Sequence, residues 1–413
     1  MLFPQPHRPS TPARVVITGA GIVTALGCGW APNAAGLRAG RTAVRRVTLF
    51  DVSRQRARTA GEVELPRGLP ASKLAARQAA RISRANRMLL LAADEAWRQA
   101  GWEPSEYLPL VLGTTAGGMS LGEDFFRQAR SAPRRYRGQA VRTLHYQSHL
   151  QARVLAEAFG CQGPLTVVAD ACATGATALG TAWELLRWGR AERVLAGGYD
   201  EIVQLVFAGF DSLQALSPTV CRPFDSGRDG LTLGEGASVM ALETLGHARR
   251  RHAEILGEIV GYGTSIDLHH LTQPHPRGDA ALQAMERACA SAGLLPANVD
   301  YLNAHGTGTA LNDSAEAAAI NRWGGNHAAT LPVSSTKGSF GHTLGGAGAI
   351  EAVVCLMALR EQWLPPEPTL QDPDPACTFP VVREPTDARL EVALSNSFGF
   401  GGVNASLILR RWR

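Results

Sequence analysis

Residues 165–196 read LTVVADACATGATALGTAWELLRWGRAERVLA, and they indicate the fold class most directly. The stretch opens with a β-type run at 165–169. After a turn, apolar residues recur at helical spacing over 179–186 until Gly189 offers a C-cap. A second β-type run follows at 193–196. A strand, a helix and a strand in close succession are typical of parallel sheets covered by helices, so the sequence predicts an α/β fold.

The turn between that strand and that helix, residues 170–175, consists mostly of small side chains and contains Cys172. A thiol at the N-terminal end of a helix lies near unpaired backbone N–H groups and the positive end of the helix dipole, which favour the thiolate. We therefore predict that Cys172 is a nucleophile rather than a small buried side chain. The other cysteines form no CxxC pair for zinc or redox exchange and are interpreted as buried residues in a reducing cytoplasm; they are Cys28, Cys161, Cys221, Cys289, Cys355 and Cys377.

The C-terminal part of the chain repeats the alternation of strands and helices. Its expected elements are strands at 255–260 and 299–303 and helices at 279–292, 313–323 and 349–359. Small-residue turns at 169–175 and 395–402 stand at similar places in the two parts, which indicates a duplication. We predict a flexible N-terminal tail at 1–13, followed by halves at 14–254 and 255–413.

Two further loops carry chemically useful side chains. Lys337 and His342 lie in the glycine-rich segment 334–348, and Lys337 is one of only two lysines beside 39 arginines. A compact ammonium differs from a planar guanidinium, so Lys337 is expected where an arginine does not fit. His305 ends a strand and is followed by Gly-Thr-Gly-Thr. Two neutral imidazoles that donate N–H bonds toward one point would stabilise an enolate or an oxyanion.

Length and composition exclude several classes of protein. The chain has 413 residues, of which 45% are hydrophobic and 19% charged, and it is long enough for two similar halves. The net charge is +5 and we find no zinc-finger spacing or aromatic RNA-binding motif, so we expect no nucleic-acid partner. No apolar run approaches the roughly 20 residues that cross a bilayer, and residues 1–14 lack a signal-peptide core, so we expect no membrane insertion.

Arginines gather in two segments of the first half. They are interpreted either as a patch for an acidic partner or as a solvated surface. The members are Arg77, Arg81, Arg84 and Arg87, followed by Arg127, Arg130, Arg134, Arg135, Arg137 and Arg142.

Two other motifs have structural interpretations that we favour. Residues 18–24 contain a G-x-G that lacks the third glycine of a dinucleotide-binding loop, so we expect a tight turn in the core rather than a nucleotide site. Residues 313–316, Asp-Ser-Ala-Glu, have the pattern of a capping box. A structural role is therefore favoured over catalysis for Asp313 and Glu316.

Several motifs, in this order along the chain, resemble those of one enzyme family. They are ACATG around Cys172, CRPFD at 221–225, NAHGTGT around His305, SSTKGSFGH at 334–342 and NSFGFGGVN at 396–404. Together they resemble the elongating β-ketoacyl-acyl-carrier-protein synthases, or ketosynthases, of the thiolase superfamily over nearly the whole chain. The resemblance implies an α/β, thiolase-like five-layer αβαβα fold with two duplicated halves.

The resemblance also implies a reaction. Cys172 would hold an acyl group as a thioester, and His305 and His342, supported by Lys337, would promote decarboxylation of a malonyl group on the acyl carrier protein. The carbanion would then attack the acyl group, a decarboxylative Claisen condensation that elongates a fatty-acid, polyketide or polyene chain. Backbone N–H groups of Cys172 and Phe400 would form the oxyanion hole.

Further residues match positions that bind the substrate. By the resemblance, Thr307 and Thr309 bond the phosphopantetheine arm on which the carrier protein holds its substrates, and Phe400 gates the acyl pocket. Ala116 stands where a bulkier side chain often closes that pocket, which leaves the acyl group open. No metal and no other bound cofactor is implied.

The resemblance implies protein partners as well. Arg84, Arg127 and Arg130 fall in regions that dock the acidic acyl carrier protein, which favours the docking interpretation of the arginine cluster. The chain would form a homodimer, or a heterodimer with a related ketosynthase or chain-length factor. The alternative function is that of a non-catalytic chain-length-factor-like partner of another ketosynthase. Such partners usually lack the nucleophile, whereas Cys172 is present.

Overall fold

The computed structural model describes residues 11–103, 107–132 and 146–413, and within them the long strands form two groups with the same order. The first group runs β1 (Val15–Thr24), β8 (Gly236–Thr244), β7 (Arg193–Asp200), β5 (Leu110–Gly113) and β6 (Leu165–Val168). The second runs β9 (Gly257–Ile266), β15 (Val403–Arg411), β14 (Val392–Phe398), β10 (Tyr301–Asn303) and β11 (Val333–Ser334).

The strand directions repeat as well as the order. In each group the first three strands pair antiparallel and the last three pair parallel. The two groups join where residues 15–17 of β1 pair antiparallel with residues 257–259 of β9. The predicted duplication is therefore confirmed.

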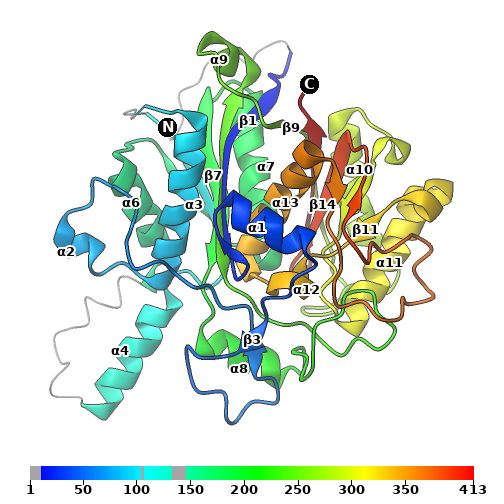
Figure 1. The fold of residues 1–413 in the computed structure, drawn as a ribbon, viewed down its shortest axis with the longest axis horizontal. Helices are drawn as coiled ribbons and strands as arrows, with labels where there is room; N and C mark the ends of the chain where they lie inside the picture. Colours follow the sequence, from blue (N-terminus) through cyan, green and yellow to red (C-terminus); the bar gives the residue numbers. More distant parts are fainter. Residues whose placement is uncertain (1–10, 104–106, 133–145) are drawn as a thin grey trace.

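Helices cover both groups of strands and also fill the space between them (Figure 1). The outer layers consist of α3 (Arg84–Ala100) with α6 (Ser148–Phe159) on one side, and of α10 (Asp279–Ala292) with α11 (Ala310–Gly324) on the other. The middle layer consists of α7 (Thr174–Arg187) and α13 (Ala347–Glu361). Residues 347–359 of α13 are all buried, as expected for a helix that is apolar all round. This arrangement confirms the five-layer α/β fold.

The remaining elements are one 13-residue helix, α4, and shorter helices and strands. They are α1 (Trp30–Arg38), α2 (Ala76–Ala79), α4 (Met119–Ser131), α8 (Gln204–Ser212), α9 (Leu245–Arg250) and α12 (Lys337–Phe340), with β2 (Gly27–Cys28), β3 (Arg45–Arg46), β4 (Thr59–Ala60), β12 (Trp363–Leu364) and β13 (Thr386–Asp387). None of the helices in the described part of the chain has the length and apolarity of a membrane span.

Glycines bring the N-terminal ends of the two central helices into direct contact. A Cβ atom at Gly175 would lie 2.6 Å from the backbone nitrogen of Ala349, and one at Gly348 would lie 2.6 Å from that of Ala176. Neither position has room for a side chain, so backbone packs on backbone. The turn that precedes α7 therefore lies beside the loop that precedes α13.

The structure refines three sequence predictions. The unit at 165–196 is present, but β5 lies between its two parallel strands. The capping box at 313–316 is wrong, because α11 begins at Ala310 and its N-cap is Thr309. The G-x-G motif lies inside β1, where Cβ atoms at Gly19 and Gly21 would clash with the backbone of α3, so these glycines serve packing. Most of the predicted tail, residues 1–10, lies outside the described residues.

Candidate active site

A cavity of about 460 Å³ lies at the carboxyl ends of the strands, and both halves contribute to its walls. Such ends are where α/β folds usually place their ligands. The lining includes Cys172 from the first half and His305, His342 and Phe400 from the second. The loops that carry Cys172, His305, His342 and Phe400 therefore converge on one cavity. Lys337 lies behind the cavity wall rather than in it.

Cys172 lies in a strained turn ahead of the central helix α7. Its neighbour Ala171 has a φ of +49°, which is unfavourable for a residue with a side chain, and residues 171–173 form one 3-10 turn. The hydroxyl of Thr115 donates a hydrogen bond of 3.0 Å to the Ala171 carbonyl. A Cβ at Gly399 would lie 3.2 Å from the Cys172 nitrogen, so the glycine-rich loop lies directly against the nucleophile.

The resting thiol is protonated, contrary to the sequence prediction of a thiolate. Burial raises the pKa of Cys172 to about 12, although the charge of Lys337 and a hydrogen bond from the Phe400 backbone both lower it. Desolvation thus outweighs the effect of the helix N-terminus. The Phe400 N–H therefore lies beside the sulfur, the atom to which an acyl group would be attached.

The two histidines face each other in the cavity. Their ring centroids are 5.3 Å apart with nearly perpendicular planes. His342 Nδ1 accepts a hydrogen bond of 3.1 Å from the Leu344 N–H, so in the neutral ring the proton is on Nε2. Among the described residues, neither His342 Nε2 nor His305 Nδ1 has a hydrogen-bond partner. Both histidines line the cavity, so these ring nitrogens are available to a ligand there.

Both imidazoles are neutral. Burial, followed by the positive charge of Lys337, lowers the pKa of His305 and of His342 well below the usual value. Neutral rings can donate a hydrogen bond from one nitrogen without protonating the substrate, which suits the stabilisation of an enolate.

Lys337 is buried and is fixed by two acceptors. Its Nζ atom donates a hydrogen bond of 2.5 Å to the backbone carbonyl of His305 and forms an ion pair with Glu351. Glu351 was not among the predicted site residues. The sequence did contain a signal for it, because Glu351 is the one acid in an otherwise apolar stretch of α13. Burial raises the pKa of Glu351 to about 7. The pair holds the His305 loop against the central helix.

Asp313 and Glu316 have the structural role that was predicted, through different bonds. Glu316 accepts the backbone N–H groups of His305 and Gly306 at 2.9 and 2.7 Å. Asp313 accepts the N–H of Thr307 at 3.0 Å. Both acids therefore shape the loop that presents His305 instead of capping their own helix.

Two protein-family models match the chain. The Beta-ketoacyl synthase N-terminal domain matches residues 13–248, and the Beta-ketoacyl synthase C-terminal domain matches residues 256–371. The chain belongs to the β-ketoacyl synthase family. A 3-oxoacyl-[acyl-carrier-protein] synthase 2 from Synechocystis sp. is 38% identical over 416 residues, which cover 97% of this chain and 98% of that protein.

Two solved structures resemble this β-ketoacyl synthase closely. The ishigamide ketosynthase/chain length factor matches with a TM-score of 0.89 and 32% identity, covering 97% of this chain and 100% of the other. A complex of a type II polyketide synthase acyl-carrier protein with its ketosynthase bound to the hexaketide, AntDE:AntF, matches with a TM-score of 0.87 and 26% identity, covering 97% and 100%. The predicted family, acyltransferase class and thiolase-like fold are confirmed.

Three of the four predicted substrate-binding residues line the cavity, and one does not. Thr307 and Thr309 line the cavity and their hydroxyls are 2.8 Å apart. Phe400 also lines it, is 39% exposed and stacks on Phe210 at 5.6 Å. Ala116 is not among the described residues that line the cavity, and its N–H is bonded to a buried carboxylate instead. The role of Ala116 in the acyl pocket therefore stays a prediction.

The synthase also separates the three docking arginines. The guanidinium of Arg84 points inward and pairs with the fully buried Glu235. Its charge is compensated inside the protein, so we no longer expect Arg84 to dock the carrier protein. Arg127 and Arg130 lie on α4, and both are partly exposed. The arginines predicted at 134, 135, 137 and 142 lie outside the described residues.

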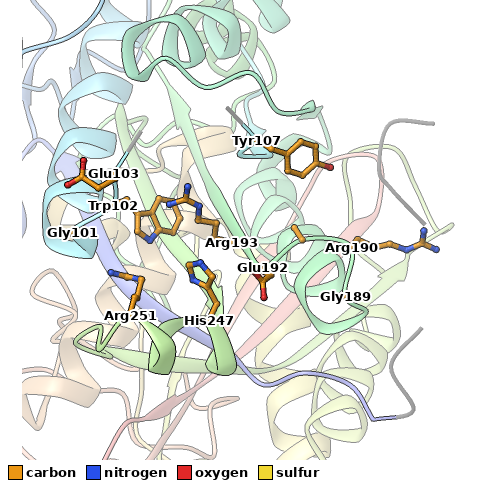
Figure 2. A pocket seen from close by; sticks show the side chains of 11 residues that line it. Gly101, Trp102, Glu103, Tyr107, Gly189, Arg190, Glu192, Arg193, His247 and Arg251 are labelled. Carbon is orange, nitrogen blue, oxygen red and sulfur yellow. The ribbon is translucent and has the colours of Figure 1, made fainter. Parts of the chain in front are cut away.

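A second cavity, of about 680 Å³, lies where β7 begins, about 23 Å along the strand from its end at the site (Figure 2). Trp102, His247 and Arg251 line it and donate hydrogen bonds to the buried Glu243. Burial raises the pKa of Glu243, but hydrogen bonds, led by that from Arg251, outweigh it and lower the pKa to about 2. The hydrogen-bond donors of these three side chains are thus directed to one buried carboxylate.

Proposed function

We propose that Cys172, His305 and His342 form one reaction centre for decarboxylative Claisen condensation. The observation that carries this proposal is that one cavity contains a thiol, two neutral imidazoles and a backbone N–H aimed at the sulfur. Each group suits a different step of the reaction.

In the first step the Cys172 sulfur attacks the thioester carbonyl of an acyl group on the carrier protein. The carbonyl oxygen becomes an oxyanion, which the backbone N–H groups of Cys172 and Phe400 stabilise. When the carbonyl re-forms, the carbon–sulfur bond to the phosphopantetheine breaks, and its thiol leaves with the proton that Cys172 has lost. The acyl group is now a thioester of Cys172.

In the second step a malonyl thioester binds with its carbonyl oxygen between His305 and His342. The bond to the carboxylate carbon breaks, carbon dioxide leaves, and its electron pair forms an enolate whose oxygen accepts hydrogen bonds from the imidazoles. The enolate carbon then attacks the acyl thioester, and the Cys172 sulfur leaves as the thiolate. The product is a β-ketoacyl chain two carbons longer.

The carrier protein would deliver both substrates on its phosphopantetheine arm. Thr307 and Thr309 offer hydroxyls in the wall of the cavity, where they can bond the amides of such an arm. Arg127 and Arg130 supply positive charge for an acidic carrier. We propose both pairs as binding residues.

We also propose that the synthase acts as a homodimer or as a heterodimer with a chain-length factor. Among the described residues its β6 is an edge strand, which a strand of a second chain could extend. A reducing cytoplasm is the proposed compartment because all seven cysteines are free. The non-catalytic alternative is not favoured, since a pseudo-enzyme has no use for a nucleophile and both histidines in one cavity.

The experiment is mass spectrometry of the intact synthase after incubation with acyl-carrier protein. We expect an acyl adduct on Cys172, and no adduct on Cys172→Ala. The variants His305→Ala and His342→Ala should still form the adduct but should lose malonyl decarboxylation. An unmodified Cys172 together with no condensation product would overturn the proposed function and would favour the chain-length-factor alternative.

A further inference from the structure

Asp200 is a buried carboxylate at the carboxyl end of β7, outside the lining of the reaction cavity in the described part of the chain. Its Oδ1 atom accepts hydrogen bonds from the Thr114 hydroxyl at 2.6 Å and from the N–H groups of Ala116 and Gly117 at 2.8 and 3.2 Å. Its Oδ2 atom accepts those of Thr115 and Gly345 at 2.9 and 2.7 Å. No arginine or lysine among the described residues pairs with it, so these donors alone stabilise the carboxylate.

The donors in the turn at 114–117 connect Asp200 to the nucleophile. The turn at 114–117 wraps around Asp200, and the hydroxyl of Thr115 in that turn bonds to the carbonyl of Ala171. Ala171 has the strained φ of +49° and directly precedes Cys172. A strained residue keeps its conformation only when its surroundings hold it there.

The N–H of Gly345 connects Asp200 to a histidine in the other half of the chain. Gly345 follows Leu344, whose N–H bonds to His342 Nδ1 and so places the proton on Nε2. A Cβ at Gly345 would lie 2.8 Å from Asp200 Oδ2, so only glycine allows this close approach. One carboxylate therefore bonds to the loops that position both Cys172 and His342.

We propose that Asp200 is a positioning residue that holds the Cys172 turn and the His342 loop at a fixed separation. It touches no reacting atom and acts through Thr115 on one side and Gly345 on the other. This inference rests on the proposed roles of Cys172 and His342. No cysteine or histidine motif points to Asp200, and its role follows from its hydrogen bonds to both halves.

The carboxylate is chemically suited to this task. It offers two acceptor oxygens and no donor, whereas an asparagine offers one acceptor and an amide group that would face N–H donors. Its negative charge also contributes to the raised pKa of Cys172, after burial, which is the largest cause. Removal of that charge should therefore make the thiol more acidic while the two loops lose their common anchor.

The test compares Asp200→Asn with Glu201→Gln as a matched control. Glu201 is the next residue and equally buried, but it bonds to Ser120 and the Ala85 N–H, away from the cavity. We expect Asp200→Asn to slow condensation and malonyl decarboxylation about tenfold or more. We also expect iodoacetamide to alkylate Cys172 faster at each pH between 7 and 9. Glu201→Gln should stay within twofold of the wild type in both the rate of condensation and the rate of alkylation.

A second variant keeps the test decisive if Asp200→Asn does not fold. Thr115 is exposed, and Thr115→Val removes only the hydrogen bond to Ala171. We expect it to slow acylation of Cys172 severalfold and to leave malonyl decarboxylation unchanged.

Two results would overturn the role of Asp200. One is that Asp200→Asn condenses substrates and is alkylated at Cys172 at rates within twofold of the wild type, and the other is normal acylation in Thr115→Val. Failure of the proposed function gives a different result. In that case the wild-type synthase would condense substrates without an adduct on Cys172, or His342→Ala would retain decarboxylation.

Discussion

The Nζ atom of Lys337 lies 2.5 Å from the backbone carbonyl oxygen of His305. Among the described residues, it donates no hydrogen bond to a ring nitrogen of His305. Lys337 therefore acts on the histidine through its main chain and through the electrostatic field. Its charge, second to burial, also lowers the pKa of both His305 and His342. A single ammonium thus fixes a loop and favours the neutral imidazoles.

Replacement of Lys337 by methionine should impair both stability and decarboxylation. The variant leaves Glu351 buried without its cation, which we expect to cost about 3 kcal/mol in the free energy of unfolding. The double variant Lys337→Met with Glu351→Leu should regain most of that stability in urea unfolding. It should not regain malonyl decarboxylation, because the His305 carbonyl still lacks its donor. A double variant with wild-type decarboxylation would contradict this role.

The sequence predicted the fold, the reacting groups and the supporting Lys337, but not the supporting carboxylates Asp200 and Glu351. Cys172, His305 and His342 stand in small-residue loops at strand ends, which is a local signal. Asp200 bonds to Gly345, 145 positions away in the chain, and Glu351 acts on the His305 loop only through Lys337, so only the folded structure shows these connections. The thiolate prediction for Cys172 failed because local sequence reports the helix terminus and not the desolvation of the sulfur.

Acidification should destabilise the synthase through its two cavity histidines. Burial, then the charge of Lys337, lowers their pKa in the folded state, whereas in the unfolded chain they take up protons near pH 6.5. At these two positions the unfolded state therefore binds more protons below that pH, so the contribution of the histidines to the free energy of unfolding falls as the pH decreases, by up to about 1.4 kcal/mol per pH unit for each histidine. His342→Asn keeps an acceptor for the Leu344 N–H and should show a shallower fall between pH 6.5 and 5 in urea unfolding. An identical slope would show that His342 protonates in the folded protein.

Alkylation of Cys172 should report its raised pKa. Because burial holds the pKa near 12, the rate of modification by iodoacetamide should rise about tenfold per pH unit from pH 7 to 9 without reaching a plateau. Lys337→Met removes a charge that favours the thiolate, so it should slow the reaction at every pH in this range. Peptide mapping would measure the rate at each cysteine. A plateau below pH 8 would mean that the thiolate is already formed in the resting site.

Removal of the Phe400 ring should open the way to Cys172. The ring lines the cavity and stacks on Phe210, a contact of about 1 kcal/mol, while the backbone N–H that points at the sulfur does not depend on the side chain. Phe400→Ala should therefore alkylate faster at Cys172 and accept bulkier acyl groups. Phe210→Ala should do the same more weakly, since the Phe400 ring remains but loses its partner. Unchanged alkylation in both variants would mean that the aromatic pair does not restrict access.

Charge reversal on α4 should weaken recognition of the carrier protein and spare the chemistry. Arg127 and Arg130 are partly exposed, so Arg127→Glu and Arg130→Glu should raise the KM for acyl-carrier protein several-fold with little change in kcat, and the effect should shrink at high salt. Arg153→Glu is the control, because Arg153 is also exposed on a surface helix and has a carboxylate one turn away, Glu157. Steady-state kinetics at two ionic strengths would separate the outcomes. If Arg153→Glu raised the KM as much as the α4 variants, the effect would reflect net charge, and α4 would not be the docking helix.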